Sequence, residues 1–337
     1  MTRRPFDAVL AVAFGGPNGP DDVRPFLANV LRGRRVSPER VEEVARHYEL
    51  FGGVSPLSAM TKRQVEGLRT RLDAQGLDVP IYLGMRNWHP LLPDTLGRMA
   101  EDGVRRAIGF VLAAHRSYSS CTQYRQNVMD ARREIVAAGL PDIDIVYVAD
   151  WHNHERFIEA NTRHVRAAFE TLPAALRPVA RLVFTAHSIP VSMPGAARYC
   201  AQLTESARLV AARLRVEDWS LVFQSRSGRP EDPWLEPDIC QYLRAERARG
   251  LAAAVVCPIG FLCDHIEVRY DLDHEAREVC REIDLPMVRS ETVNDDPIFL
   301  DMMADVVWQT WTRYRTGSPL TLAFPAAASM PAPACRP

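Results

Sequence analysis

Eight short apolar runs alternate with amphipathic stretches along this chain, and this alternation limits the folds that it can adopt. The runs are rich in Val, Ile and Leu, which predicts strands at 7–14, 79–84, 106–113, 143–149, 180–186, 220–224, 251–258 and 286–290. Helical patterns fall between most of them, at 58–75, 92–102, 124–138, 155–170, 196–214, 235–249, 265–282 and 297–314. Strands that are apolar throughout and separated by helices indicate parallel sheets covered on both faces.

The predicted strands divide into two groups of about four, and a chain of 337 residues is long enough for about two domains. We predict an α/β fold with two similar Rossmann-like domains, each built on a parallel four-stranded sheet. The domains are expected at 1–150 and 151–315, with the last helix packing back across either or both. Residues 316–337 are rich in Ala and Pro and lack periodicity, which predicts a disordered tail.

Composition argues against several classes of partner. The formal net charge is -1, so no basic excess points to nucleic acid or an anionic membrane surface. No apolar run is long enough to span a membrane, and Met1 leads into a short strand-like run rather than a signal peptide, so we expect a cytoplasmic protein. We also expect a monomer. The seven cysteines form no C-x-x-C pair, which argues against a zinc ribbon or a disulfide framework.

Three carboxylates lie at helical spacing near the C-terminal end. An apolar run and a Pro/Gly turn precede a predicted helix that carries Glu267, Asp271 and Glu275 at i, i+4 and i+8, on one helical face. Like charges at this spacing destabilise a helix by roughly 0.2–0.5 kcal/mol per pair. The pattern fits a site that binds cations or moves protons, and it equally fits a solvated acidic face.

Several chemically useful residues follow predicted strands. In open parallel α/β sheets, ligands bind beyond the carboxyl ends of the strands. We therefore expect His115, His187 and Glu267 to face one cleft between the domains. The His187 imidazole can exchange protons near neutral pH or ligate a metal, and it can also be a hydrogen-bonded residue that closes a strand.

Other motifs are less specific. Gly15-Gly16-Pro17 is not a nucleotide-binding pattern, because Pro17 removes a backbone amide, and a tight turn that admits a flat ligand fits better. Arg32 belongs to a basic cluster that is either a solvated loop or a partner for ligand carboxylates. His152 and His154 alternate like a metal pair, but no strand pattern supports them, so we expect surface or supporting histidines.

Together these residues resemble the ferrochelatase family over about residues 7–314. The segments that carry the resemblance come in order: Gly15-Gly16-Pro17, Arg32-Gly33-Arg34, 52–57, Gly84-Met85-Arg86 with Pro90, 185–190, Gln224-Ser225-Arg226, 258–267 and Asn294-Asp295. The His-Ser-Ile-Pro segment at 187–190 and the Asp-His-Ile-Glu segment at 264–267 are the most specific.

The resemblance implies a metal chelatase, a lyase that inserts Fe²⁺ into a free-base porphyrin in heme biosynthesis and releases two protons. It implies a macrocycle bound between two Rossmann-like domains, with His187 and Glu267 as the catalytic pair. His187 would accept a pyrrole proton or be the first iron ligand. His187 and Glu267, with Asp271 and Glu275, would handle the metal, and a π-type bulge is expected in their helix. Expected porphyrin contacts are Phe14, Arg32, Ser55, His115, Ser117 and Tyr124.

The chain departs from the family pattern at several positions. Some members hold a [2Fe-2S] cluster through cysteines near the C-terminus, but only Cys335 lies in this tail, so we expect no cluster and no permanently bound cofactor. Phe14 stands where many relatives have Tyr, and Leu31 where some have a second Arg. Cys263, beside the acidic helix, is expected to pack rather than to bind metal.

The substrate remains open between two porphyrins. The segment 114–117, Ala-His-Arg-Ser, resembles a histidine-containing loop of enzymes that act on coproporphyrin III, whereas protoporphyrin IX enzymes often have Gln there. This favours coproporphyrin III, with protoporphyrin IX as the alternative. A cobalt chelatase for sirohydrochlorin fits the length less well. A non-catalytic tetrapyrrole- or metal-binding bilobal protein is the alternative of another class, and the presence of both His187 and Glu267 argues against it.

Overall fold

Two parallel four-stranded sheets organise the chain. The computed structural model describes residues 4–33, 36–227 and 231–316. The first sheet has the order β2-β1-β3-β4 and the second β6-β5-β7-β8, with every pairing parallel. The strands are β1 Ala8–Ala13, β2 Ile81–Met85, β3 Arg106–Val111, β4 Asp144–Tyr147, β5 Ala180–His187, β6 Trp219–Gln224, β7 Ala253–Cys257 and β8 Met287–Arg289. The predicted fold class and all eight predicted strands are confirmed.

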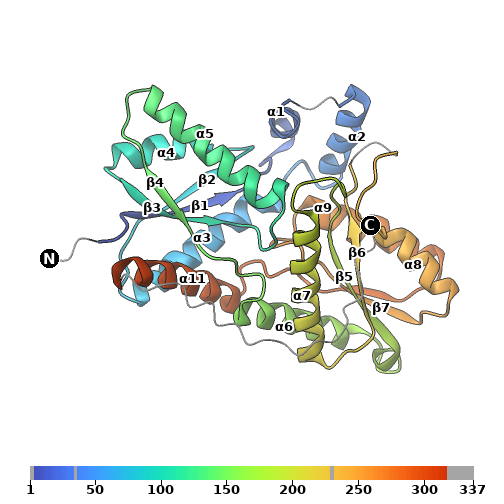
Figure 1. The fold of residues 1–337 in the computed structure, drawn as a ribbon. Helices are drawn as coiled ribbons and strands as arrows, with labels where there is room; N and C mark the ends of the chain where they lie inside the picture. The colour runs from blue at the N-terminus through green and yellow to red at the C-terminus, as the bar shows by residue number, and fades with distance from the viewer. Residues whose placement is uncertain (1–3, 34–35, 228–230, 317–337) are drawn as a thin grey trace.

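The central strands are apolar because helices cover both faces of each sheet (Figure 1). Every residue of β1 and β7 is buried. The helices are α1 Val23–Val30, α2 Pro38–Glu49, α3 Pro56–Ala74, α4 Leu92–Glu101, α5 Gln123–Ala137, α6 Glu155–Thr171, α7 Ala196–Leu214, α8 Ile239–Ala248, α9 Ile266–Val268, α10 Arg277–Glu282 and α11 Pro297–Thr316. Short 3₁₀ turns lie at η1 Pro20–Asp22 and η3 Arg177–Val179.

Two short helices, α1 and α2, were absent from the predicted set. Their apolar residues do not join either sheet but form a small separate cluster with Trp88, around Phe26 and Leu27. Helix α2 buries only Ala45 fully and contains few apolar residues, so no apolar run marks it in the sequence. Helix α8 starts at Ile239 rather than at 235, because the Asp238 side chain accepts hydrogen bonds from the amides of Cys240 and Gln241 and caps the helix there.

The predicted helix 265–282 is continuous but changes its geometry. It begins as α9, widens into the π-helix η4 (Arg269–Ala276), and ends as α10. The expected π-type distortion is therefore present and occupies eight residues rather than a single bulge. A second π-turn, η2 (Tyr118–Thr122), precedes α5 and was not predicted.

One large apolar core runs through both halves of the chain. It joins side chains beneath the first sheet, such as Phe110, to side chains beneath the second, such as Phe184 and Val255. Helix α11 packs against α3 of the first half and α6 of the second, as Figure 1 shows at the lower left. The two sheets thus divide the chain into a first half with β1–β4 and a second half with β5–β8. Both halves share one apolar core.

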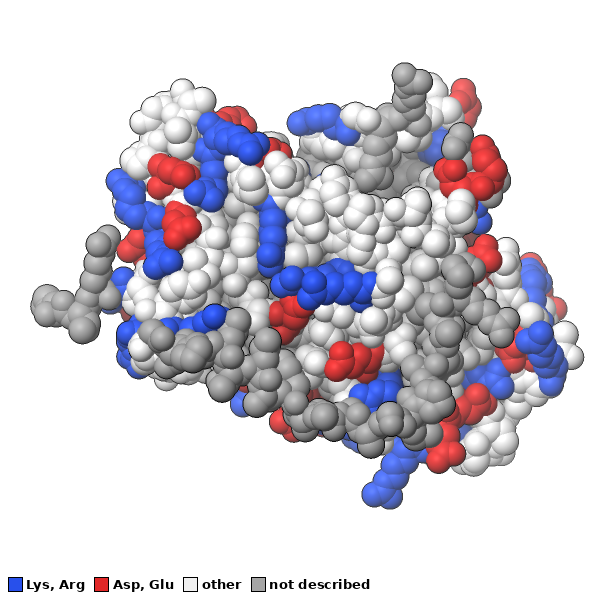
Figure 2. Space-filling view, viewed as in Figure 1, with Lys and Arg blue, Asp and Glu red and all other residues white. Residues whose placement is uncertain are grey.

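Charged side chains of both signs are interspersed on the face shown in Figure 2, as expected for a net charge near zero. Among the described residues, no helix combines the length and apolar character needed to cross a bilayer. Except for Thr316, the predicted disordered tail at 316–337 lies outside the described residues, as do Arg34 and Arg35 of the basic cluster.

Candidate active site

His187 and Glu267 meet beyond the carboxyl ends of the second sheet. His187 is the last residue of β5, and Glu267 lies in the first turn of α9, which follows β7. The His187 Nε2 atom is 3.9 Å from a Glu267 carboxylate oxygen. Their side chains are 35% and 41% exposed, so both reach solvent and a ligand can reach both. The structure therefore brings together the two residues predicted to form the catalytic pair.

The backbone fixes which nitrogen of His187 is free. Nδ1 lies 2.5 Å from the Ser188 carbonyl oxygen, which only accepts, so Nδ1 carries the hydrogen and donates it. Nε2 is therefore the nitrogen that faces Glu267, and in the neutral ring it carries the lone pair. Ser188 is itself held, because its amide donates to the Gln224 carbonyl oxygen at 2.7 Å and its hydroxyl to the Leu235 carbonyl oxygen at 2.8 Å. A neutral imidazole of this tautomer can accept a proton or ligate a metal through Nε2.

Asp271 lies behind this pair, on η4. Gln224 Nε2 donates to its carboxylate at 3.2 Å, and the Ser225 hydroxyl also donates to it. Burial raises the pKa of Asp271 to about 8, and the nearby charges of Glu267 and Glu275 push in the same direction against the two hydrogen bonds. The three carboxylates therefore interact electrostatically, as their spacing predicted, and Asp271 exchanges a proton near neutral pH.

Glu275 continues the acidic ridge (Glu267, Asp271 and Glu275) toward solvent. Burial raises the pKa of its carboxyl group, with Asp238 adding to the effect, although the residue is exposed at the surface. On the same π-helix, the Tyr270 ring stacks on His47 of α2, with centroids 3.7 Å apart and planes at 14°. This stack joins the first half of the chain to the helix that carries the acidic ridge.

Strand β8 holds the acidic helix from its other side. The Arg289 guanidinium donates two hydrogen bonds of 2.8 Å to Asp273 of η4 and one of 2.7 Å to Asp264 in the preceding loop. Asn294 donates to Asp264 at 2.8 Å. Because Asp271 is tied to β6 and Asp273 to β8, the widened helix is fixed between two strand ends, which positions Glu267 opposite His187.

Side chains of the first half lie within electrostatic range of this pair. The Arg86 guanidinium carbon is 5.6 Å from the Phe14 ring centroid and 5.0 Å from that of Tyr124, which is buried. Burial raises the pKa of Tyr124 to about 12, with Arg86 lowering it and Glu267 raising it. Burial also raises the pKa of Tyr48, with Glu267 again contributing, so both phenols lie within electrostatic range of Glu267.

Two serines expected to contact the ligand have structural partners. Ser55 is buried and caps α3, accepting from the Leu57 amide at 3.4 Å. A Cβ on Gly16 would lie 2.7 Å from the Ser55 Cβ, so only glycine permits this close approach of the first turn. Ser117 is buried and caps η2 through a reciprocal pair with Ser120. Both hydroxyls shape the loops at the strand ends.

Arg32 lies apart from the catalytic pair. It is exposed just after α1 and donates to the Asn29 side chain at 2.6 Å, while Asn29 donates to the Asn87 carbonyl oxygen at 3.1 Å. Among the described residues it makes no ion pair, so its charge is available to an anionic group at the rim.

His115 differs from the expectation that it faces the same cleft as His187 and Glu267. Only 3% of the residue is exposed, and its Nε2 is 3.0 Å from the Ser206 hydroxyl of α7. Burial lowers the pKa of His115 to about 3, with His152 adding to the effect, so the ring is neutral. The ring packs near Phe157 and Tyr199 because α7 covers the end of β3, which the sequence pattern did not indicate.

His152 and His154 both have partners within the fold, and neither is exposed at the surface. His152 is buried and lies 2.9 Å from Glu205, and His154 caps α6 by accepting from the Arg156 amide at 3.3 Å. On α7, the Tyr199 hydroxyl donates to the His187 carbonyl oxygen at 3.1 Å.

Sequence reasoning missed Tyr48, and it noted Arg86 and Gln224 only as parts of family segments. Arg86 and Gln224 directly follow or end strands, so the strand-end rule could have found them. Tyr48 lies on α2, whose small number of apolar residues left it out of the predicted helices. No group of three or more His, Cys, Asp or Glu side chains in the described ranges is arranged to hold a metal ion. Cys263 is buried, as a packing role requires.

Comparisons with known proteins agree with this geometry. Of the solved structures, SirB from Bacillus subtilis with Fe³⁺ superposes with a TM-score of 0.57 at 13% identity, covering 92% of this chain and 97% of that one. A second SirB structure, described as a sirohydrochlorin chelatase with cobalt, gives a TM-score of 0.51 at 12% identity, covering 91% and 95%. Two parallel sheets in this arrangement therefore define a chelatase fold.

Comparison of the sequence with known families identifies which chelatase family the chain belongs to. The profile of the ferrochelatase family matches residues 6–311, and the chain belongs to this family of metal-chelating lyases. A ferrochelatase of Rhodopirellula baltica is 45% identical over 304 residues, covering 90% of this chain and 86% of the relative. A coproporphyrin III ferrochelatase of Nocardia farcinica is 44% identical over 309 residues, covering 89% and 87%.

Proposed function

We propose that this protein inserts Fe²⁺ into free-base coproporphyrin III and releases two protons. The observation that carries the proposal is the approach of His187 Nε2 to Glu267, at 3.9 Å, beyond the strand ends of a chelatase fold. A base and an acid–base partner facing one accessible space suit the removal of pyrrole protons. Family membership and the names of the relatives support the choice of metal and macrocycle.

His187 acts in this proposal as the first proton acceptor. Nδ1 is engaged by the Ser188 carbonyl oxygen, so a pyrrole N–H can donate only to Nε2. The imidazolium that forms lies beside Glu267, whose carboxylate stabilises the positive charge. The Fe²⁺ ion that enters the macrocycle replaces its two pyrrole protons. The net charge of the site is therefore restored once both protons have left it.

The acidic ridge then carries protons away from His187 and Glu267 and brings Fe²⁺ to them. Asp271, with a pKa of about 8, gains and loses a proton readily near neutral pH. It lies between Glu267 and the more exposed Glu275, so protons can leave along these carboxylates. The same oxygens are hard ligands that suit hydrated Fe²⁺ as a transient substrate, although the described residues hold no preformed cage for it.

Planar side chains of the first half suit a flat macrocycle. Phe14 and the Arg86 guanidinium are partly exposed planar groups, with the buried Tyr124 ring beside Arg86, and the exposed Arg32 offers a positive charge. Coproporphyrin III carries four carboxylates and protoporphyrin IX two. His115 gives no direct support for either porphyrin because its ring is buried, so the choice of coproporphyrin III follows the names of the relatives.

Parallel insertion assays test the proposal. The protein is supplied anaerobically with Fe²⁺, or with Zn²⁺ as a surrogate, and with either coproporphyrin III or protoporphyrin IX, while the porphyrin bands are followed in the visible spectrum. We expect many turnovers and a higher kcat/KM for coproporphyrin III. A spectral shift that stops at one equivalent would instead identify a binding protein, and a higher kcat/KM for protoporphyrin IX would reverse the choice of substrate.

We further propose a cytoplasmic monomer without a permanently bound cofactor or [2Fe-2S] cluster. Six cysteines within the described ranges are free thiols, which suits a reducing compartment, and ferrous iron also persists best there. Iron and sulfide analysis of the protein as purified, together with its molar mass in solution by light scattering, tests these points. Stoichiometric iron and sulfide or a dimeric mass would overturn the corresponding part.

A further inference from the structure

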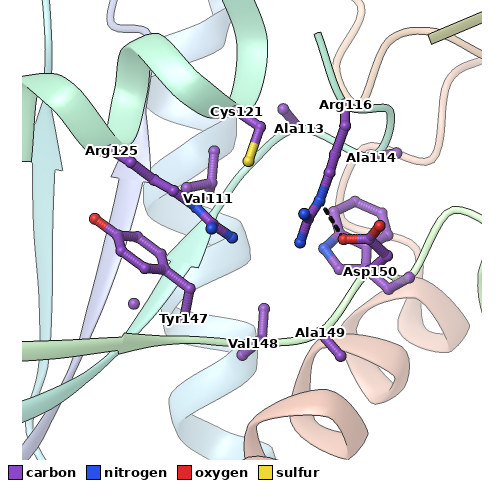
Figure 3. A pocket seen from close by; sticks show the side chains of 12 residues that line it. Val111, Ala113, Ala114, Arg116, Cys121, Arg125, Tyr147, Val148, Ala149 and Asp150 are labelled. Carbon is purple, nitrogen blue, oxygen red and sulfur yellow. Dashed lines mark ion pairs between the residues drawn. The ribbon is translucent and has the colours of Figure 1, made fainter. Parts of the chain in front are cut away.

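A pocket lies away from the catalytic pair, between β4, the end of β3 and the turn that leads into α5. It is small and open to solvent on one side. None of the predicted site residues lines it. Its polar side chains are Arg116, Arg125, Cys121, Tyr147 and Asp150 (Figure 3). The pocket can admit part of a compact group at its open side, and it is too small to enclose a porphyrin.

Arg125 has no anionic partner in this pocket. Its guanidinium lies over the Tyr147 ring, 4.4 Å from the centroid, and its buried Nε finds no hydrogen-bond acceptor. Within the described residues, no carboxylate pairs with it. Burial raises the pKa of Tyr147 to about 12, so this phenol stays neutral and cannot balance the charge. A buried donor left without an acceptor is unfavourable, and more so when it is charged.

The second arginine is already engaged. Arg116 forms an ion pair with Asp150, and Figure 3 shows its guanidinium and that of Arg125 directed toward the same space. Asp150 also accepts from Arg198 of α7 at 2.9 Å and from Gln202 at 3.1 Å. One carboxylate therefore serves two arginines, and Arg125 adds a third cation, so the pocket has an excess of positive charge.

We propose that this pocket binds a compact oxyanion, whose carboxylate or phosphate oxygens accept from the Arg125 guanidinium. The fork of guanidinium donors matches two oxygens of such a group. The aromatic face of Tyr147 keeps the fork in place, and Arg116 contributes its positive charge from across the pocket. None of the predicted porphyrin contacts lines the pocket, and the proposal does not depend on the proposed function.

Cys121 provides a local readout. It lines the pocket and is partly exposed, so a bound anion should shield it from alkylation. Cys240 on α8 is the other partly exposed thiol in the described ranges and lies outside the pocket, which makes it an internal control. Rates at both residues can be measured in one sample by peptide mass spectrometry.

The experiment uses the full chain at constant ionic strength in chloride, with inorganic phosphate or citrate as the probe. We expect at least one probe to bind by calorimetry and to slow alkylation of Cys121 at least threefold, with no change at Cys240. Arg125→Gln should weaken binding at least tenfold, and Arg125→Lys, which keeps the charge but loses the fork, should weaken it less. Arg133→Gln, an exposed residue of α5 paired with Asp130, is the matched control and should behave like the wild type.

The two probes distinguish the source of the oxygens. Protection by phosphate alone assigns a phosphate site, protection by citrate alone a carboxylate site, and protection by both a general oxyanion site. Equal slowing at Cys121 and Cys240, unchanged protection in Arg125→Gln, or no protection by either probe would overturn the proposal. Circular dichroism and the Tm of Arg125→Gln verify that loss of binding does not reflect loss of the fold.

Discussion

The Nε2 atom of His187 and the carboxylate of Glu267 are 3.9 Å apart, although His187 ends β5 and Glu267 lies in α9, which follows β7. Their proximity depends on Gln224, which accepts from the Ser188 amide through its carbonyl oxygen and donates to Asp271 through its side chain. One residue at the end of β6 thus supports both the loop after His187 and the helix that carries Glu267. Most of the testable consequences concern this arrangement.

His187→Ala should reduce metal insertion by at least about 100-fold, because general acid–base groups typically contribute 10²–10⁴-fold. The side chain is one-third exposed, so its loss should leave the Tm and porphyrin binding close to those of the wild type. Insertion rates come from the porphyrin absorbance, and affinity from fluorescence quenching. A folded variant with normal turnover would remove His187 from the mechanism.

Glu267→Gln should slow insertion by about 10-fold or more, since a neutral amide no longer stabilises the imidazolium beside it. Porphyrin affinity should change much less, because the amide has nearly the same shape. Glu278→Gln on α10 is the matched control, as Glu278 is exposed and far along the helix from the pair. Equal kcat values for Glu267→Gln and Glu278→Gln would contradict the assigned role.

Asp271→Asn should change how stability depends on pH. The native pKa of about 8 lies above the value of about 3.9 for an unfolded Asp, so the native state holds an extra proton between these values. The stability of the wild type should therefore fall as pH rises through this window, and the Asn variant should lack this contribution. Urea unfolding at several pH values measures the difference. Parallel curves for both proteins would argue against a raised pKa.

Glu275→Gln should raise the KM for the metal while leaving the KM for the porphyrin nearly unchanged. The reason is that Glu275 lies at the exposed end of the acidic ridge, on the side away from His187. Steady-state kinetics with each substrate varied in turn provide the measurement. A selective rise in the porphyrin KM would show that the ridge contacts the macrocycle instead of serving the ion.

Gly260→Ala should destabilise the protein by about 1–3 kcal/mol, as overpacking of a tight contact does. A Cβ there would lie 2.6 Å from the Ala186 Cβ, next to His187, and would push away the loop that leads to α9. Insertion should therefore slow as well. Gly97→Ala in α4 is the control, because its nearest neighbour would be 3.8 Å away and Ala favours the helix. Equal stabilities of the two variants in urea would contradict this packing argument.

Strand ends explain what the sequence could predict. Apolar runs such as 251–258 are unambiguous because parallel strands are buried on both faces, and the residues that follow them, His187 and Glu267, necessarily approach the same edge. Recognition of the family segments added their roles. The strand-end rule failed for His115, because it locates the end of a strand but not the helix that covers it.

Packing between distant segments explains what could not be predicted. Tyr48 reaches the vicinity of Glu267 from a small helix whose position depends on the separate cluster around Phe26 and Trp88. The π-helix extends over eight residues because Asp271 and Asp273 are held by different strands. Neither relationship leaves a periodic signal in the sequence.

The interior shared by both sheets, with α11 lying against each half, has a mechanical consequence. A hinge motion that separated the halves would expose apolar side chains throughout this shared interior. The residues at the base of the site are therefore held rigidly. Helices α1 and α2 rest on a minor cluster of their own, and the His47–Tyr270 stack joins α2 to the helix that carries Glu267. A flat guest would accordingly meet a preformed site, whose residues hold their alignment throughout the cycle.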